Sequence, residues 1–296
     1  MHGILLLDKP LSLSSNAALQ RAKRLFGIKK AGHTGSLDPL ATGMLPLCFG
    51  EATKFSQYLL ESDKYYRVTA QMGCKTTTGD AEGEIIATAS LDGITQSLLE
   101  KILPRFMGEI KQIPPMFSAL KLNGQPLYKL ARKGIEVERA ARSVQIFNLK
   151  LLDFQNDKFT IDVHCSKGTY IRTLIEDIGN QLGCGAYVAN LHRIAVAPYE
   201  NAPMYSLDYL TKVLEEEGNL KLKSMLLPIE TALLKLPAVK LTLDSAYYFR
   251  QGQPVRVTHL PKEPVVRIFD EKDQFLGLGT VLEDGQVTAK RLIALN

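Results

Sequence analysis

Alternating apolar and polar residues predict strands in the first two thirds of the chain. In residues 64–72, one set of alternate positions holds Tyr66, Val68, Ala70 and Met72, and the other set is mostly polar. Successive side chains of a strand point to opposite faces, so this pattern predicts a strand with one apolar face. Residues 158–166 alternate in the same way, and the apolar run at 4–7 predicts a short buried strand.

Two segments have helical spacing instead. Apolar residues at Leu19, Ala22 and Phe26 follow Ser14, whose hydroxyl is suited to cap a helix, and Gly27 ends the pattern. In residues 169–182, apolar side chains recur every three or four positions, which predicts a second amphipathic helix.

Weaker patterns complete the expected order of elements. Strands are expected at 45–49, 117–121, 143–154 and 186–196, and helices at 51–60, 95–106 and 127–133. A turn at 78–83 predicts that residues 84–89 return beside 64–72 as a hairpin.

The pattern changes after Pro237. Short strands are expected near 238–242, 254–258, 264–269, 275–282 and 286–292, with one helix at 244–251. Many short strands separated by polar turns predict a small β-barrel. We therefore expect two domains, residues 1–235 and 236–296.

The composition is that of an ordinary globular protein, with 45% hydrophobic and 23% charged residues in a chain of 296. No apolar run approaches the roughly 20 residues that cross a bilayer, and the first residues lack a basic leader. We expect a cytoplasmic protein without membrane contact. Its four cysteines are widely spaced, which predicts neither a disulfide framework nor a metal site.

Charge is distributed unevenly. The net charge is +5, and residues 1–60 and 121–142 each carry +4. Two basic segments in a near-neutral chain favour a polyanionic partner. Basic residues that only form the solvent-exposed faces of helices would give the same distribution of charge.

The densest chemical signal is the glycine-rich segment at 31–43. Three glycines and several hydroxyls predict an irregular loop that approaches a ligand closely. The loop lacks the Gly-Lys-Ser/Thr ending of a nucleotide-binding P-loop. Asp38 is its one acid, and two interpretations stay open: an anionic nucleophile or base, or an Asp-Pro turn former.

Two further residues are candidates for the same chemistry. Arg172 lies off the apolar stripe of its predicted helix, so it is either a partner for a carboxylate or a solvent-facing arginine of the first turn. Tyr66 lies on the apolar face of its strand, so it is either a residue of the site or a tyrosine of the hydrophobic core. Ser166 and Lys167 are adjacent, and neighbouring strand residues point apart, so we reject a Ser-Lys nucleophile pair.

These residues stand within motifs that resemble the bacterial TruB family of tRNA pseudouridine synthases. The resemblance rests on the motifs at 8–10, 32–46, 50–54, 62–68, 165–172, 183–186 and 191–193, and it runs in order over residues 4–200. The tail is similar to the family's small RNA-binding PUA domain. Ser12 departs from the glycine that is common in the family, and Ser36 occupies a site that varies.

The resemblance implies an α/β fold of the α+β type, in which a large mixed, mostly antiparallel sheet is flanked by helices. It implies an isomerase that converts the uridine at position 55, in the TψC loop of tRNA, to pseudouridine. No cofactor or metal would be needed, tRNA would be the partner through its T-arm stem-loop, and the protein would act as a monomer with no obligate protein partner.

The resemblance also assigns roles to residues. Asp38 matches the nucleophilic aspartate, Arg172 its arginine partner, and Tyr66 the tyrosine that stacks on the target base and moves a proton. His33 matches the histidine that fills the space left by the flipped nucleotide. Tyr170 and Leu191 match residues that line the uracil pocket, and Lys54 matches a contact to the RNA backbone. The basic segment at 121–142 corresponds to the insertion that closes over the T-stem loop.

Three alternatives stay open at this point. Asp38 attacks either the base at C6 or the ribose. An RNA-binding chaperone without catalysis would also explain the basic segments and the β-rich tail. An enzyme that binds a nucleotide sugar or a phosphate is a weaker reading of the glycine-rich loop.

Overall fold

The computed structural model describes residues 1–294 and is built around a nine-stranded mixed sheet. Its strands follow the order β13-β1-β3-β12-β4-β11-β10-β7, and β2 pairs with β3 outside this path. Their bounds are β1 Gly3–Lys9, β2 Ala31–His33, β3 Ala41–Phe49, β4 Lys64–Met72, β7 Gly108–Gln112, β10 Arg142–Gln155, β11 Lys158–Cys165, β12 Ala186–Val196 and β13 Tyr205–Ser206. Only the β1–β13 and β3–β12 pairs are parallel, so the sheet is mixed and mostly antiparallel, as expected.

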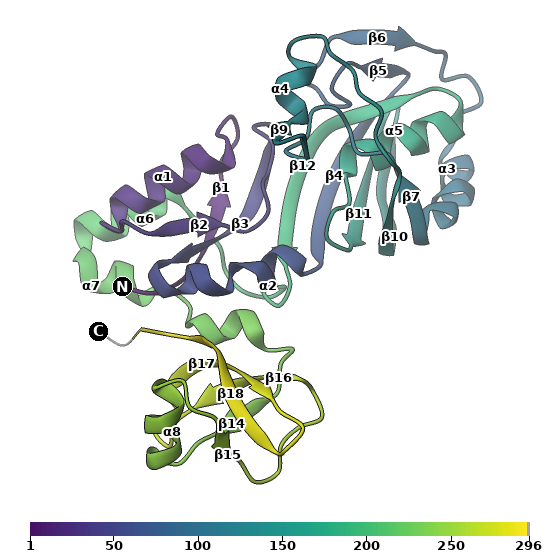
Figure 1. Cartoon of the computed structure of the whole chain (residues 1–296). Coiled ribbons are helices and arrows are strands. Elements are labelled where there is room, and N and C mark those ends of the chain that lie inside the picture. The colour runs from purple at the N-terminus through teal and green to yellow at the C-terminus, as the bar shows by residue number, and fades with distance from the viewer. Residues whose placement is uncertain (295–296) are drawn as a thin grey trace.

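Helices cover this sheet on different faces (Figure 1). They are α1 Ser15–Leu25, α2 Ser56–Glu61, α3 Gln96–Ile102, α4 Leu127–Ala131, α5 Ile171–Leu182, α6 Leu207–Glu216 and α7 Gly218–Ser224, with 3-10 turns η1 Gly50–Phe55, η2 Leu103–Phe106 and η3 Ile229–Leu233. In the described part of the chain, no helix is both long and apolar enough to span a membrane.

Strands β1 and β3 are buried on both faces. Leu5, Leu7 and Leu45 pack against α1 and α6, whereas Ile4 and Met44 belong to a second apolar cluster on the opposite side. Two covered faces explain why β1 is an unbroken apolar run, while β4 alternates. One face of β4 packs against α5, and the other presents Arg67, which forms an ion pair with Asp162 of β11.

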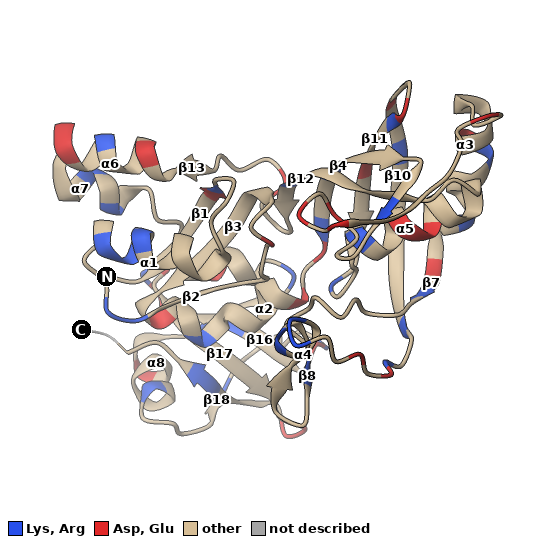
Figure 2. Cartoon of the chain, turned by 90° about the horizontal axis from the view of Figure 1, so that it is seen from above, with Lys and Arg blue, Asp and Glu red and all other residues tan. Residues whose placement is uncertain are grey.

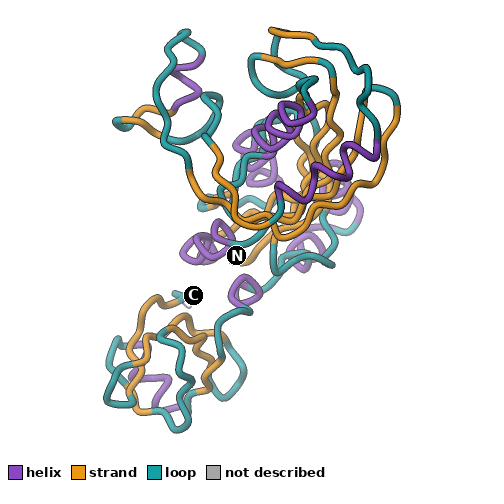
Figure 3. Tube along the Cα trace, turned by 90° about the vertical axis from the view of Figure 1, so that its right-hand side faces the viewer, coloured by secondary structure: helices purple, strands orange, loops and turns teal. Residues whose placement is uncertain are grey.

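A second, five-stranded sheet lies at one end of the molecule (Figure 3). It comprises β14 Ala238–Lys240, β15 Val255–Arg256, β16 Val265–Phe269, β17 Phe275–Val281 and β18 Gln286–Leu292, with helix α8 Leu243–Arg250 packed on it. The expected barrel is a curled, open sheet whose edges are β14 and β15. It has its own apolar cluster, which supports the proposal that a separate domain begins near residue 236.

Three local predictions are wrong. The strand expected at 117–121 is reduced to β8 Lys121–Leu122, paired with β9 Gln125–Pro126, because residues 116–119 form a bend instead. Residues 84–89 do not return beside β4: both edges of β4 are occupied by β11 and β12, so β6 Ile85–Thr88 pairs with β5 Cys74–Thr76. The loop expected over 31–43 is shorter, because its two ends form β2 and the start of β3.

Candidate active site

Asp38 lies in the short connection between β2 and β3, which is anchored to the start of α1. The Ser15 hydroxyl accepts a hydrogen bond from the Leu37 amide at 2.7 Å and donates one to the Leu37 carbonyl at 3.0 Å. The Asp38 carbonyl in turn accepts the Ala41 amide at 3.0 Å, which closes a turn into β3. Asp38 is thus a turn residue as well as a site residue, and the two interpretations of its sequence position are compatible.

Arg172 faces Asp38 across this connection. Its guanidinium Nη2 lies 3.1 Å from Asp38 Oδ2 and 2.6 Å from the Phe117 carbonyl, and its Nη1 lies 2.8 Å from the Thr78 carbonyl. The arginine is 6% exposed, so the solvent-facing alternative is wrong. Because several fixed acceptors share one planar guanidinium, its orientation toward the carboxylate is set before any ligand arrives.

A second carboxylate, Asp80, lies on the other side of Arg172, with its Oδ2 3.6 Å from Nη1. Desolvation raises the pKa of Asp38 above its ordinary value, Arg172 and Lys9 oppose this rise, and Asp80 reinforces it. Asp38 keeps 43% of its side-chain surface exposed, so water and a ligand both reach it. Arg172 therefore pairs with the Asp38 carboxylate, which a ligand can still reach and whose negative charge the arginine partly neutralises.

Tyr66, Leu191 and Arg193 lie on one face of the sheet above this pair. Tyr66 of β4 is directly opposite Arg193 of β12, and Leu191 is two positions along the same strand. The Arg193 side chain is 1% exposed and donates to the Met44 carbonyl at 2.6 Å and the Gly35 carbonyl at 3.0 Å, and its charge partly opposes the rise that burial causes in the pKa of Tyr66. Burial raises the pKa of Tyr66, so the phenol is neutral near pH 7.

Tyr170 completes the wall of the pocket at the start of α5. Both its backbone groups are bonded by the Gln112 side chain, the amide at 3.0 Å and the carbonyl at 3.3 Å, and its hydroxyl contacts Ser118. The residues around this cavity of about 350 Å³ include Asp38, Tyr66, Tyr170, Arg172, Leu191 and Arg193. A cavity of this size and mixed polarity suits one small ring with polar edges.

Comparison with known proteins identifies the chain. Residues 23–171 match the family model described as TruB family pseudouridylate synthase, N-terminal domain. Residues 172–234 match the tRNA pseudouridylate synthase B C-terminal domain, and 237–293 match the model Pseudouridine synthase II TruB, C-terminal. The chain belongs to the TruB family. It is a pseudouridylate synthase, which is an isomerase.

Relatives support this assignment over the whole length. The chain is 55% identical to a tRNA pseudouridine synthase B of Pseudomonas fluorescens, with 99% of this chain and 96% of the relative covered. It is 53% identical to the protein of the same name from Coxiella burnetii, with 99% and 95% covered.

Solved structures show the same fold at lower identity. A Cbf5-Nop10-Gar1 complex matches with a TM-score of 0.73 and 24% identity, covering 99% of this chain and 84% of that one. An H/ACA RNP bound to a substrate RNA containing 2'-deoxyuridine matches with a TM-score of 0.75 and 23% identity, covering 99% and 85%.

His33 lines a neighbouring cavity of the TruB site. This cavity, of about 490 Å³, shares Asp38, Phe117 and Arg172 with the first and adds Ser14 and Tyr128. The His33 Nδ1 is buried without a hydrogen-bond partner, and desolvation lowers the pKa of the imidazole. A neutral ring at the mouth of the site can stack on or replace a nucleobase without a desolvated charge.

Lys54 is the one expected site residue that lies outside both cavities. Its Nζ is 2.5 Å from Glu51 Oε2 and 3.0 Å from the Leu292 carbonyl of β18. The structure places Lys54 where the two sheets of this TruB protein meet, and its contact with an RNA backbone stays a prediction.

The sequence analysis missed several residues that shape the site. Asp80 lies in a segment assigned only as a turn, and Phe117 and Ser118 lie in the segment assigned as a strand. Lys9, Lys64 and Arg193 are buried cations whose hydrogen bonds go to backbone carbonyls. The sequence feature that could have identified these three residues is a lysine or arginine at a position of a strand where an apolar residue is expected. Such a residue is rarely buried without a specific partner.

Proposed function

We propose that this pseudouridylate synthase isomerises the uridine at position 55 in the TψC loop of tRNA, with Asp38 as the nucleophile. The ion pair of Asp38 with Arg172, at the base of a cavity walled by Tyr66, is the observation on which the proposal rests. The curated relatives are named tRNA pseudouridine synthases, which supports tRNA as the substrate.

The chemistry accounts for the groups in the site. The bond between N1 of uracil and C1′ of ribose breaks, the ring turns, and C5 bonds to C1′ while its proton is lost and N1 gains one. No atom or electron is added overall, so the proposal requires neither a metal nor an organic cofactor. Asp38 forms the transient covalent bond, either at C6 of the base or at the ribose, and Arg172 keeps its carboxylate oriented.

The target nucleotide must leave the stacked loop to reach Asp38. Flipping a base costs a few kcal/mol, which stacking and phosphate contacts offset. Tyr66 and Leu191 would hold the uracil, Tyr170 would close the pocket, and His33 would occupy the vacated space. The segment at 121–142 supplies Tyr128 and Arg132 to the wall of the second cavity, which supports its proposed role in closing over the stem-loop.

Under this proposal the protein works as a cytoplasmic monomer. The catalytic groups named here come from one chain, and the cavities they line are complete within it.

Release of tritium from uridine C5 tests the proposal. Unmodified tRNA labelled at C5 should lose tritium in the presence of EDTA, because C5 becomes the glycosidic carbon. Asp38→Asn should abolish release yet keep tRNA affinity within about tenfold, since phosphate contacts supply much of the binding. Full retention of tritium at position 55 together with normal tRNA binding would instead favour an RNA chaperone. Near-normal turnover of Asp38→Asn would exclude Asp38 as the nucleophile.

A further inference from the structure

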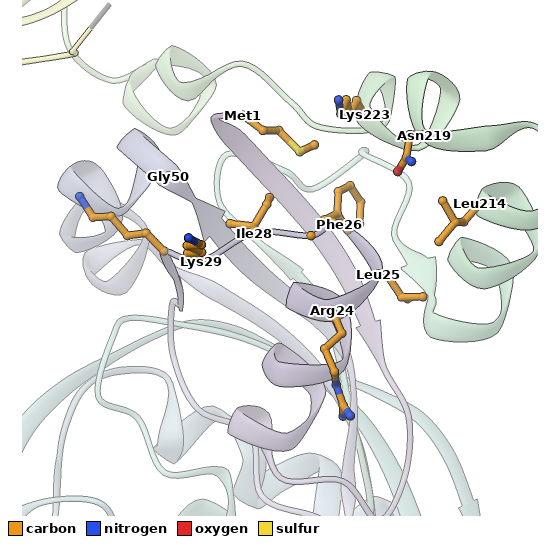
Figure 4. A pocket seen from close by; sticks show the side chains of 12 residues that line it. Met1, Arg24, Leu25, Phe26, Ile28, Lys29, Gly50, Leu214, Asn219 and Lys223 are labelled. Atoms are coloured by element: carbon orange, nitrogen blue, oxygen red, sulfur yellow. The ribbon is translucent and has the colours of Figure 1, made fainter. Parts of the chain in front are cut away.

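A cationic cavity separate from the catalytic pocket lies at the C-terminal end of α1. It measures about 620 Å³, and its lining residues include Arg24, Lys29, Lys30 and Lys223 but no acid. In Figure 4, Arg24 projects from the last turn of α1 away from the other labelled side chains, Lys29 lies on the connection that follows α1, and Asn219 and Lys223 come from α7. A smaller cavity continues it past Gln20 and Lys23.

In the part of the chain that the structure describes, no carboxylate balances the charge of most of these cations, although the Arg24 Nε also donates a long hydrogen bond of 3.4 Å to the Gln20 carbonyl. Helix α1 ends in a turn whose own amides bond its last carbonyls: Gly27 N–H donates to the Arg24 carbonyl and Ile28 N–H to the Lys23 carbonyl. Basic side chains are therefore not needed to satisfy that helix end. Among the ion pairs of residues 1–294, none involves Arg24, Lys29 or Lys223.

Lys30 is the exception, and its pairing is weak. Its Nζ lies 3.8 Å from Glu51, and its side chain is 60% exposed. Because Lys54 binds the same carboxylate at 2.5 Å, one negative charge serves two lysines. The cavity thus keeps an excess of positive charge that is open to solvent.

Helix α1 connects this cavity to the catalytic site. Its first residues, Ser15 and Asn16, line the cavity that holds Asp38 and His33, and its last turn lines the cationic cavity. The 11 residues of α1 span about 16 Å, a length that several phosphates of a strand occupy. Basic residues colour part of this helix in Figure 2, and two of them, Arg21 and Arg24, are exposed.

We propose that the cavity at the C-terminal end of α1 is a second RNA-binding site, which takes the sugar–phosphate backbone of the substrate tRNA outside the stem-loop that enters the catalytic pocket. The inference rests on the proposed function, because it takes tRNA as the substrate. Flexible, exposed lysines and an arginine bind phosphates without reading the sequence, so this site adds affinity and orientation. It would favour a whole tRNA over an isolated stem-loop.

The test compares two RNAs with one triple variant. Arg24→Gln, Lys29→Gln and Lys223→Gln are combined, and dissociation constants are measured over a range of salt concentrations for full-length tRNA and for the isolated T-arm stem-loop. For tRNA we expect at least a tenfold loss of affinity and a salt slope that falls by about 2. For the stem-loop we expect affinity within twofold of the wild type.

A matched variant controls for the loss of three charges. Lys101→Gln, Lys150→Gln and Lys158→Gln change exposed lysines of α3, β10 and β11, and should leave both affinities within twofold. A circular dichroism spectrum and a thermal unfolding midpoint like those of the wild type show that the first triple variant is folded.

Two results would overturn the inference. One is unchanged tRNA affinity and salt slope in the first variant, and the other is an equal loss with the stem-loop. Binding is measured without turnover, so an inactive wild-type protein would sink the proposed isomerisation while leaving this binding comparison readable.

Discussion

At the residue scale, the site is dominated by cations held in place by neutral oxygens. The Lys9 Nζ donates to the Leu13 carbonyl at 2.6 Å, and the Lys64 Nζ donates to the Leu60 carbonyl at 2.7 Å. Arg193 is bound to carbonyls in the same way. Positive charge from Arg172 and Lys9 opposes the rise that desolvation causes in the pKa of Asp38, and it would stabilise negative charge that develops during the reaction.

The acid limit of the pH–rate profile should report Asp38. Its pKa is raised, and the carboxylate is the active form, so activity falls as the pH drops through that pKa. Arg172→Gln should raise the pKa further, move the acid limb to higher pH and lower kcat by about 100-fold. Asp80→Asn removes a like charge and should move the limb to lower pH. Profiles of kcat/KM for the two variants that shift in the same direction would contradict this electrostatic account.

Burial of Lys9 and Lys64 should make stability rise at alkaline pH. Desolvation lowers the pKa of each from its ordinary value to about 8. The unfolded chain therefore holds these protons longer, and the free energy of unfolding should increase between pH 8 and 10. Chemical denaturation should show a gain on the order of 2 kcal/mol. Lys9→Met should remove part of this gain, whereas Lys101→Met, on an exposed helix, should not.

At the scale of elements, the site depends on how closely β3 and β12 approach. They run in parallel, and Gly43 pairs with Arg193. Gly43 has a φ of +97°, and a Cβ there would lie 2.3 Å from the Arg193 carbonyl oxygen. The absence of a side chain at Gly43 thus lets β12 carry Leu191 and Arg193 over the Asp38 connection.

Gly43→Ala should destabilise the protein by about 2–4 kcal/mol and lower activity, because strain and steric overlap act together. Gly93→Ala is the matched control: its φ is +78°, but no atom lies within 4 Å of the added carbon. It should cost only about 1–2 kcal/mol. Equal losses in urea denaturation for the two variants would show that backbone strain alone, and not the approach of β12, sets the cost.

At the scale of the whole molecule, the C-terminal sheet is packed onto the catalytic unit. The rings of Phe55 and Phe275 lie 5.8 Å apart, the Arg291 Nη1 donates to the Lys54 carbonyl at 3.0 Å, and the Glu51 carboxylate accepts the Ala294 amide at 2.8 Å. This contact fixes the orientation of the second sheet relative to the active site, so one RNA could touch both.

Deleting residues 237–296 should weaken tRNA binding by at least tenfold. The rate of a single turnover at saturating tRNA should fall less than about threefold, since the residues that line the cavity around Asp38 all precede residue 237. The truncation uncovers Phe55 and Leu59, so Phe55→Ser in the shortened chain is a useful solubility control. A slow single turnover combined with normal tRNA binding would contradict the prediction that the C-terminal sheet contributes to binding and not to catalysis.

The sequence alone determined features that depend on neighbours along the chain. Alternation placed Tyr66 on the buried face of β4, helical spacing predicted α5, and turn residues separated the strands beyond Pro237. The motifs predicted the family before any contact was known. Such features follow from local periodicity, which depends only on residues that are close together in the sequence.

Only the tertiary structure decided which distant groups meet. The burial of Arg172 between Asp38 and Asp80, and the placement of Arg193 directly opposite Tyr66, join segments on different strands and turns. Strand β2 exists because β3 offers it a partner, and the hairpin of β5 with β6 forms because the edges of β4 are already filled. Pairing and burial are properties of the whole fold, since each depends on which other segments compete for the same edge or cavity.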